Sequence, residues 1–191
     1  MSALEIITIT FSIILGLGVT QILERVAYVV REKEQRRLHW IPLSVAFLIL
    51  LFQVQFWFAL VIVDSFLDKW NWTVYSVLLF LTIVIFLSGA TVLPSPGSSR
   101  SSNLIEDFNA RGKISLLFFA SYFIGWIVIA IMFWTAGEFT TLVIVNLAMA
   151  TTAVIAYRTQ HPYVRSLLHG ILIAITIYGL IFVWATPSLE W

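Results

Sequence analysis

Residues 40–66 read WIPLSVAFLILLFQVQFWFALVIVDSF, and the only charged side chain in this stretch is Asp64. A helix that crosses the hydrocarbon core of a bilayer needs about 20 mainly apolar residues. This stretch is long enough, and its one proline, Pro42, stands near the start, where a missing backbone N–H is tolerated. The stretch therefore predicts a transmembrane helix that carries two glutamines, Gln53 and Gln55, near its middle.

Five other stretches share this apolar character and predict five more helices. The six expected helices cover residues 3–30, 40–66, 71–93, 113–135, 139–157 and 164–186. Proline placement supports these bounds, because no proline falls in the middle of an expected helix. The sequence therefore predicts an all-α fold, a polytopic bundle of about six spanning helices that forms a single transmembrane domain over residues 1–191.

The composition excludes several classes of protein. Hydrophobic residues make up 60% of the chain and charged residues 11%, whereas a soluble domain has about 25% charged residues. So few polar side chains cannot cover a water-exposed globule, but a lipid bilayer removes that need. The net charge of +1 gives no electrostatic case for binding nucleic acid. The absence of cysteine excludes disulfides, thiolate metal sites and cysteine nucleophiles.

Lysine and arginine indicate the orientation of the bundle, because they gather on the cytoplasmic side of membrane proteins. With six helices, Lys69 is the one basic residue of the eleven on its side. The other side carries Arg25, Arg31, Lys33, Arg36, Arg37, Arg100, Arg111, Lys113, Arg158 and Arg165. We expect this second side to face the cytoplasm and both termini to lie on the outer, periplasmic side.

The connection over residues 94–112 is the one sizeable loop, and we expect it to be a flexible cytoplasmic loop. Its first part, PSPGSSRSS at residues 94–102, is rich in Ser, Pro and Gly. Asn103 followed by Glu106 matches the N-cap residue and returning carboxylate of a helix start. A short surface helix is therefore expected over about residues 104–110.

One face of the first expected helix is polar or small along its whole length. At 100° per residue, the following residues share it: Glu5, Ser12, Gly16, Thr20 and Glu24. The small residues at four-residue spacing are typical of a ridge that another helix approaches closely. The alternative is that this face lines a polar cavity, with Glu5 at its outer mouth and Glu24 at its inner mouth.

The two central glutamines of the second helix also allow two interpretations. Each needs a hydrogen-bond partner in lipid, and candidate partners on other helices are Gln21, Asn146 and Thr151. In the other interpretation, Gln53 lines a path for water or a substrate, and Gln55, which points nearly opposite, faces a second helix or a subunit. Asp64 and Glu5 are expected at similar depth on the outer side. They form either an acidic rim that attracts cations or two solvated residues at helix ends.

All three histidines, His39, His161 and His169, fall on the expected cytoplasmic side, near Glu24. A metal site there is conceivable, but the ligand spacing that usually marks one, such as histidines four residues apart, is missing. Motifs of serine hydrolases, zinc proteases and nucleotide-binding loops are also missing. We therefore expect no catalytic residue, metal or cofactor.

The segment SIILGLGVTQIL at residues 12–23 is followed by a basic loop, by His39-Trp40 and by FQVQFW at residues 52–57. This order resembles a family of small bacterial multi-pass inner-membrane proteins of about six helices, and EDFNAR at residues 106–111 is a weaker similarity. The resemblance implies a bacterial inner-membrane protein. It implies no activity.

Three hypotheses for the function follow from these patterns. The first is a channel- or transporter-like protein with a polar path along the first two helices. The second is a membrane scaffold or accessory subunit that binds a protein, lipid or ligand partner, or a second copy of itself, and it rests on the same residues interpreted as helix packing. The third is an intramembrane enzyme that uses the histidines and Glu24.

Overall fold

The computed structural model describes residues 3–32, 37–66, 70–96, 103–133 and 139–183. These residues form helices and no strand. Six helices are long and apolar enough to cross a membrane. In order, the elements are α1 (Ala3–Arg31), α2 (Trp40–Phe66), α3 (Trp72–Val92), α4 (Leu104–Asp107), the π-helical turn η1 (Phe108–Gly112), α5 (Ile114–Phe133), α6 (Phe139–Arg158), α7 (Pro162–Tyr178) and the π-helical turn η2 (Gly179–Val183).

The observed helices follow the expected ones closely. All six expected spans are present, and the largest difference at a helix start is at α7, which begins at Pro162. The short surface helix is also confirmed: the side chain of Asn103 accepts a hydrogen bond from the backbone N–H of Ile105 at 3.2 Å, and α4 follows. Part of the expected flexible loop (97–102) and four of the basic residues lie outside the described residues, namely Lys33, Arg36, Lys69 and Arg100.

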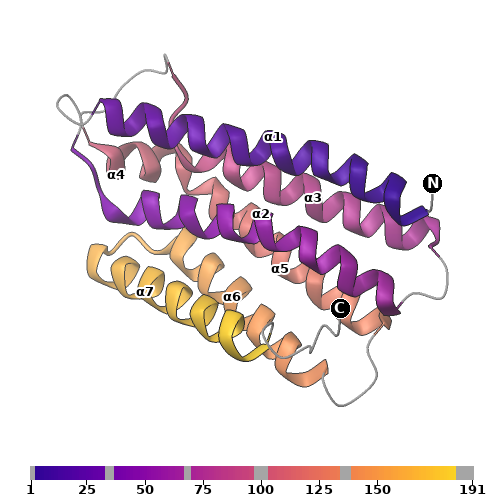
Figure 1. Cartoon of the computed structure of the whole chain (residues 1–191). Helices are drawn as coiled ribbons and strands as arrows, with labels where there is room; N and C mark the ends of the chain where they lie inside the picture. Colours follow the sequence, from indigo (N-terminus) through magenta and orange to yellow (C-terminus); the bar gives the residue numbers. More distant parts are fainter. Residues whose placement is uncertain (1–2, 33–36, 67–69, 97–102, 134–138, 184–191) are drawn as a thin grey trace.

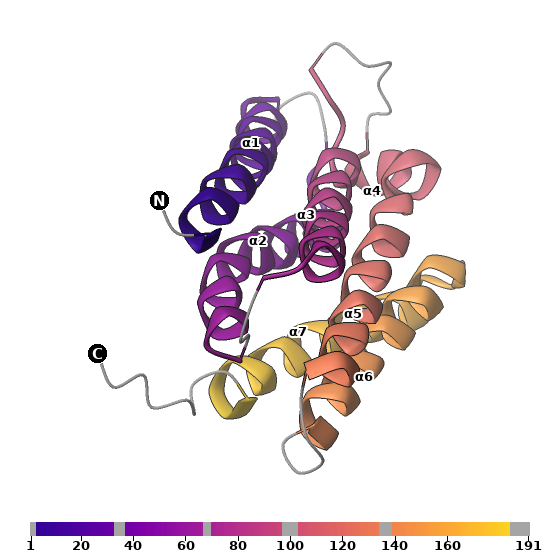
Figure 2. The same ribbon diagram turned by 90° about the vertical axis from the view of Figure 1, so that its right-hand side faces the viewer.

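The six long helices form a bundle in which helices consecutive in the chain run antiparallel, whereas the packed pairs α1–α3 and α2–α7 run parallel (Figure 1). α1 packs on α2 and α3, α3 packs on α5, α5 on α6, and α6 on α7. α7 returns to contact α2, as the view along the bundle shows (Figure 2). The ends of α1, α3 and α6 and the starts of α2, α4 and α7 lie together, and we call this the basic end.

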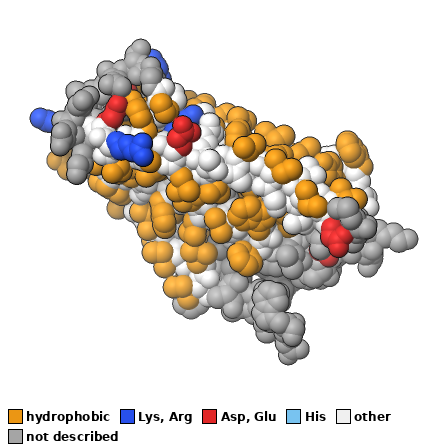
Figure 3. All heavy atoms as spheres, turned by 45° about the horizontal axis from the view of Figure 1, so that its top comes forward, with side chains coloured by type: hydrophobic (Ala, Val, Ile, Leu, Met, Phe, Trp, Pro, Cys, Tyr) orange, Lys and Arg blue, Asp and Glu red, His pale blue; other side chains and the backbone are white. Residues whose placement is uncertain are grey.

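The charged side chains are separated from a long apolar surface. On the face shown in Figure 3, blue and red side chains lie near the two ends, and the surface between them is apolar or uncharged. The exposed apolar side chains of the bundle include Ile13 and Leu17 on α1 and Phe47 on α2. A surface of this kind matches the hydrocarbon core of a bilayer between two polar headgroup layers.

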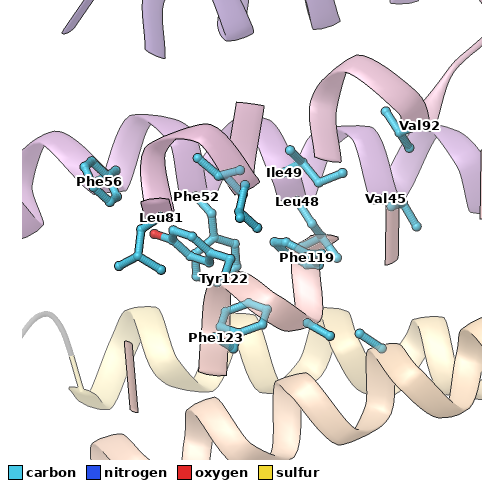
Figure 4. Packing of buried hydrophobic residues seen from close by; sticks show 14 of the residues in the cluster. Val45, Leu48, Ile49, Phe52, Phe56, Leu81, Val92, Phe119, Tyr122 and Phe123 are labelled. Carbon is cyan, nitrogen blue, oxygen red and sulfur yellow. The ribbon is translucent and has the colours of Figure 1, made fainter. Parts of the chain in front are cut away.

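Aromatic side chains fill the centre of the bundle, between α2 and α5 (Figure 4). The ring of Phe52 lies 5.4 Å from that of Phe119 and 5.0 Å from that of Phe123, and both pairs meet edge to face. Tyr122 extends this cluster toward Phe56. Edge-to-face pairs add about 0.5–1.5 kcal/mol each beyond the buried area. Helices in lipid depend on such packing, because lipid tails are as apolar as the core.

The turn η1 joins α4 to α5 and widens the helix locally. The backbone N–H of Lys113 donates to the carbonyl oxygen of Phe108 at 2.7 Å, five residues back. A Cβ atom on Gly112 would lie only 2.7 Å from the carbonyl oxygen of Val92, so η1 packs directly on the end of α3. Single π-helical turns occur often at functional sites, and this one lies at the basic end.

Hydrogen bonds join separate segments of the chain at the same end. The backbone N–H of Leu104 donates to the carbonyl oxygen of Arg37 at 3.1 Å, within a single parallel bridge between Arg37 and Asn103. Arg25 donates from its guanidinium to the carbonyl oxygen of Leu93 at 2.5 Å. These contacts fix α4 and the end of α3 relative to α1 and α2.

Candidate functional site

Gln53 is sealed inside the bundle. None of its surface is exposed, and its Nε2 atom donates to the carbonyl oxygen of Ile85 on α3 at 3.3 Å. A Cβ atom on Gly18 of α1 would lie 2.6 Å from this Nε2, and one on Gly89 of α3 would lie 3.2 Å from it. The amide is therefore held where α1, α2 and α3 meet, in direct contact with both neighbouring helices.

The close approach of helices expected at Gly16 is found at Gly18 instead. A Cβ atom on Gly16 would meet no other atom within 4 Å. Two residues turn a helix by about 200°, so Gly16 and Gly18 face nearly opposite directions. The buried face of α1 is apolar apart from Gly18 and contains Leu15 and Ile22. The polar ridge of the first helix thus points largely away from α3.

The other polar side chains of the expected ridge do not share one environment, and each is described by its own contact or exposure. Ser12 accepts a hydrogen bond from the indole N–H of Trp57 at 2.9 Å, which links α1 to α2. Thr20 is exposed and donates to the carbonyl oxygen of Gly16 in its own helix at 2.8 Å. Glu5 and Glu24 are exposed, close to opposite ends of α1.

Asn146 and Thr151, which were expected to bond to the glutamines, make hydrogen bonds within their own helix instead. Asn146 is buried, and its Nδ2 donates to the carbonyl oxygen of Leu142 in the same helix at 2.8 Å. Thr151 likewise bonds within its own helix. The Oε1 atoms of Gln21, Gln53 and Gln55 are buried without a hydrogen-bond partner among the described residues.

Asp64 lies near the C-terminal end of α2 and is half-buried. One of its carboxylate oxygens accepts a hydrogen bond from the indole N–H of Trp70 at 2.7 Å. This contact connects the end of α2 to the residues before α3. Asp64 therefore has a local structural partner, whatever else it attracts.

A different group of residues converges at the basic end, around Arg165 in the first turns of α7. This side chain is 6% exposed. Its guanidinium donates to the side-chain oxygen of Asn109 in η1, and to the carbonyl oxygen of Thr159 after α6 at 2.8 Å. Its Nε atom is buried without a partner among the described residues. Both acceptors are uncharged, so these contacts leave the positive charge of Arg165 unneutralised.

His169 lies one turn after Arg165 and is 1% exposed. Its Nδ1 lies 2.7 Å from the carbonyl oxygen of Arg165. Because a carbonyl oxygen only accepts, the proton of the neutral ring is assigned to Nδ1, and Nε2 is left as an acceptor. Nε2 is buried without a partner among the described residues. The ring of Phe108 packs against the imidazole edge to face, with 6.3 Å between the ring centroids.

His39 and Lys113 lie at the same end of the bundle, directly before α2 and α5. Burial, and after it the positive charge of Arg165, lowers the pKa of His39 and the pKa of Lys113. Nδ1 of His39 accepts a hydrogen bond from the backbone N–H of Ile41 at 3.2 Å, which leaves Nε2–H as its donor. The ammonium group of Lys113 lies over the ring of Tyr157, 5.7 Å from its centre.

We call Arg165, His169, His39 and Lys113 the basic cluster. It brings together α7, η1 and the residues before α2 and α5. The third histidine, His161, is exposed and precedes α7. Within the described ranges, no three His, Cys, Asp or Glu residues are placed to hold a metal ion, so the three histidines do not form the ligand set considered from the sequence.

Sequence reasoning missed the basic cluster because it counted Arg165 and Lys113 only as part of a general excess of cytoplasmic charge. One signal was available: Arg165 and His169 are four residues apart and therefore share a helix face. No pattern in the sequence predicted that His39 and Asn109 lie at the same end of the bundle as these two residues.

Comparisons with known proteins add no further information: no family model, no curated protein and no solved structure matches this chain. The function is therefore argued from the geometry of the polar groups.

Proposed function

We propose that this protein is a multi-pass protein of the bacterial inner membrane that acts by binding a partner at its basic end, as a scaffold or accessory subunit. The observation that carries the proposal is the basic cluster, in which the hydrogen-bond acceptors of buried Arg165 among the described residues, Asn109 and Thr159, are uncharged. A buried charge without compensation is costly, and a partner that supplies the compensation binds there favourably.

The polar-path hypothesis has weaker support. It rested on Gln53 and on the polar face of α1, but Gln53 is sealed by Gly18 and Gly89, and Gly16 faces away from the neighbouring helices. The same polar groups are used for helix packing: Ser12 bonds to Trp57, and Gln53 bonds to α3. Interhelical hydrogen bonds in membranes are common structural features.

We also propose that the basic end faces the cytoplasm. The described basic residues at this end are Arg25, Arg31, Arg37, Arg111, Lys113, Arg158 and Arg165. Excess Lys and Arg in short loops favours retention on the cytoplasmic side of a bacterial inner membrane. In this orientation α1 begins on the periplasmic side.

The test uses the natural lack of cysteine, which makes every introduced cysteine unique. Tyr163→Cys at the basic end and Trp72→Cys at the opposite end form a matched pair, because the two aromatic side chains are 82% and 78% exposed. In intact cells, a membrane-impermeant thiol reagent should label Trp72→Cys and leave Tyr163→Cys unlabelled. The opposite pattern overturns the orientation.

The same pair tests binding. In permeabilised native membranes, a bound partner should slow the labelling of Tyr163→Cys relative to the purified protein in phosphatidylcholine nanodiscs. Trp72→Cys should react equally in both. Equal rates for Tyr163→Cys in both preparations would contradict binding at the basic end. Ion flux into proteoliposomes that exceeds that of empty vesicles and is abolished by Gln53→Leu would instead support transport.

A further inference from the structure

We propose that the basic cluster is a binding site for a phosphate group, carried by a lipid headgroup or by a soluble phosphate compound. The inference deepens the binding function proposed above and rests on it, because it names the chemistry of the partner. It stands on the buried side chain of Arg165, which bonds to Asn109 in η1 and whose Nε has no partner among the described residues. Lys113 directly follows η1, and His39 precedes α2 at the same end of the bundle.

The charge at this place is the first argument. The carbonyl and amide oxygens that Arg165 contacts are uncharged, and the contact described for the ammonium group of Lys113 is with the ring of Tyr157. Burial, and after it the positive charge of Arg165, disfavours protonation of both Lys113 and His39. An anion bound next to Arg165 offsets this repulsion, because it attracts each of the three positive groups.

The hydrogen-bond capacity is the second argument. Arg165 has five N–H groups, of which Nε–H has no acceptor, and Nε2–H of His39 points away from its own backbone contact. Lys113 brings up to three more donors. A phosphate carries several oxygens that accept bonds from donors in different directions, and charge-assisted bonds of this type are about twice as strong as neutral ones.

The position in the fold is the third argument. Lys113 directly precedes α5, and His39 directly precedes α2. Both starts lie at the same end as α4 and the first turn of α7 (Figure 1). The ends of spanning helices lie at the depth of lipid phosphates, beyond the hydrocarbon core. His39 and Lys113 are half-buried and therefore reachable from that layer.

The acidic residues nearest in sequence to Lys113 are Glu106 and Asp107, the last two residues of α4 directly before η1, and each has an interaction of its own. A carboxylate next to Arg165 would compete with an external anion. Asn109, which accepts a hydrogen bond from Arg165, offers a way to test this competition. Replacing Asn109 by Asp places a fixed carboxylate against the guanidinium.

The experiment measures ligand-dependent stabilisation of the full chain in dodecyl maltoside micelles, which contain no phosphate, followed by tryptophan fluorescence on heating. Three preparations are compared: detergent alone, detergent with added inorganic phosphate, and detergent with added phosphatidylglycerol. Stabilisation by the anionic lipid alone identifies a lipid headgroup as the source of the phosphate. Stabilisation by inorganic phosphate as well identifies a soluble phosphate compound. The same midpoint in all three preparations overturns the proposal.

Two conservative variants separate a built site from general surface charge. Lys113→Gln removes a charge from the basic cluster, and Arg111→Gln removes an exposed charge two residues away in η1. We expect Lys113→Gln to weaken the apparent affinity by about tenfold, the usual effect of losing one charge-assisted contact, and Arg111→Gln to leave it nearly unchanged. Equal losses in both variants would show diffuse attraction and overturn the site.

A third variant keeps the proposal testable if a loss of charge disturbs folding. Asn109→Asp retains the hydrogen bond to Arg165 and adds a negative charge, so the protein should remain folded while phosphate-dependent stabilisation is lost. Stabilisation that persists in Asn109→Asp contradicts binding at Arg165. Protection of Tyr163→Cys in native membranes, together with failure of every phosphate probe, would overturn this inference and leave the proposed binding function standing.

Discussion

The guanidinium of Arg165 donates a hydrogen bond to the side-chain oxygen of Asn109, and this contact joins the start of α7 to η1 across 56 residues of sequence. The π-helical turn places Asn109 there, because η1 adds a residue to the turn between α4 and α5. This hydrogen bond thus holds together two segments that are far apart in the sequence.

Asn109→Asp should stabilise the protein. The exchange converts a hydrogen bond to a neutral oxygen into an ion pair with Arg165, and because Asn109 is exposed the gain should be about 1 kcal/mol or less. Thermal unfolding in detergent measures it at low and high salt. The matched control is Asn109→Ala, which removes the hydrogen bond to Arg165 and should lower the unfolding midpoint. The prediction is contradicted if Asp and Ala shift the midpoint in the same direction.

Acidification should destabilise the protein through His39. Burial, followed by the charge of Arg165, lowers the pKa of His39 below its usual value in the folded state. The unfolded chain therefore binds more protons, and stability falls as the pH drops below about 6.5, the pKa of unfolded His. The loss of stability is complete once the pH lies below the pKa of His39 in the folded protein. Unfolding midpoints between pH 7.5 and pH 5 should fall less in His39→Gln, with the exposed His161→Gln as control. Parallel profiles for wild type and His39→Gln would refute the assignment.

The helices could be predicted from the sequence because lipid imposes a simple rule: each span must be long, apolar and free of interior proline. The N-cap at Asn103 was equally readable, because its chemistry is local. The π-helical turn could not be predicted, since Phe108 to Gly112 contains nothing that an ordinary helix excludes. Only the contact of Gly112 with the end of α3 shows why the chain is glycine there.

Gly112→Ala should destabilise the bundle, whereas Gly16→Ala should not. A Cβ atom on Gly112 would lie 2.7 Å from the backbone oxygen of Val92, which cannot move without shifting α3, whereas one on Gly16 meets nothing within 4 Å. Overpacking of this type costs about 1–3 kcal/mol. Alanine favours a helix by roughly 1 kcal/mol over glycine, so Gly16→Ala should be neutral or stabilising. Equal unfolding midpoints for the two variants would count against the packing described here.

The contact between Ser12 and Trp57 should show a small coupling energy. The indole N–H of Trp57 donates to the Ser12 hydroxyl at 2.9 Å between α1 and α2. Interhelical bonds of this kind average about 0.6 kcal/mol in membrane proteins. A double-mutant cycle with Ser12→Ala and Trp57→Phe measures the coupling, and Thr20→Ala replaces Ser12→Ala in the control cycle. Additive effects in the first cycle would mean that the bond does not form.

The candidate site was far less predictable than the fold. Periodicity shows which residues share a face of a helix, but it does not show what that face meets, so Gly16 and Gly18 could not be told apart in their roles. Arg165 looked like one more cytoplasmic charge, because an arginine near a helix start is normally solvated. Its burial depends on Asn109 and Thr159, which reach it from two other segments.

The bond from Gln53 to the carbonyl oxygen of Ile85 also has a consequence for how the protein is made. Synthesis proceeds from the N-terminus, so α1 and α2 enter the membrane before α3. During that interval Gln53 has no Ile85 to bind, and Ile22 on α1 has no Gly89 to pack against. The first three helices therefore close as a unit only after residue 92, at the end of α3, has been added.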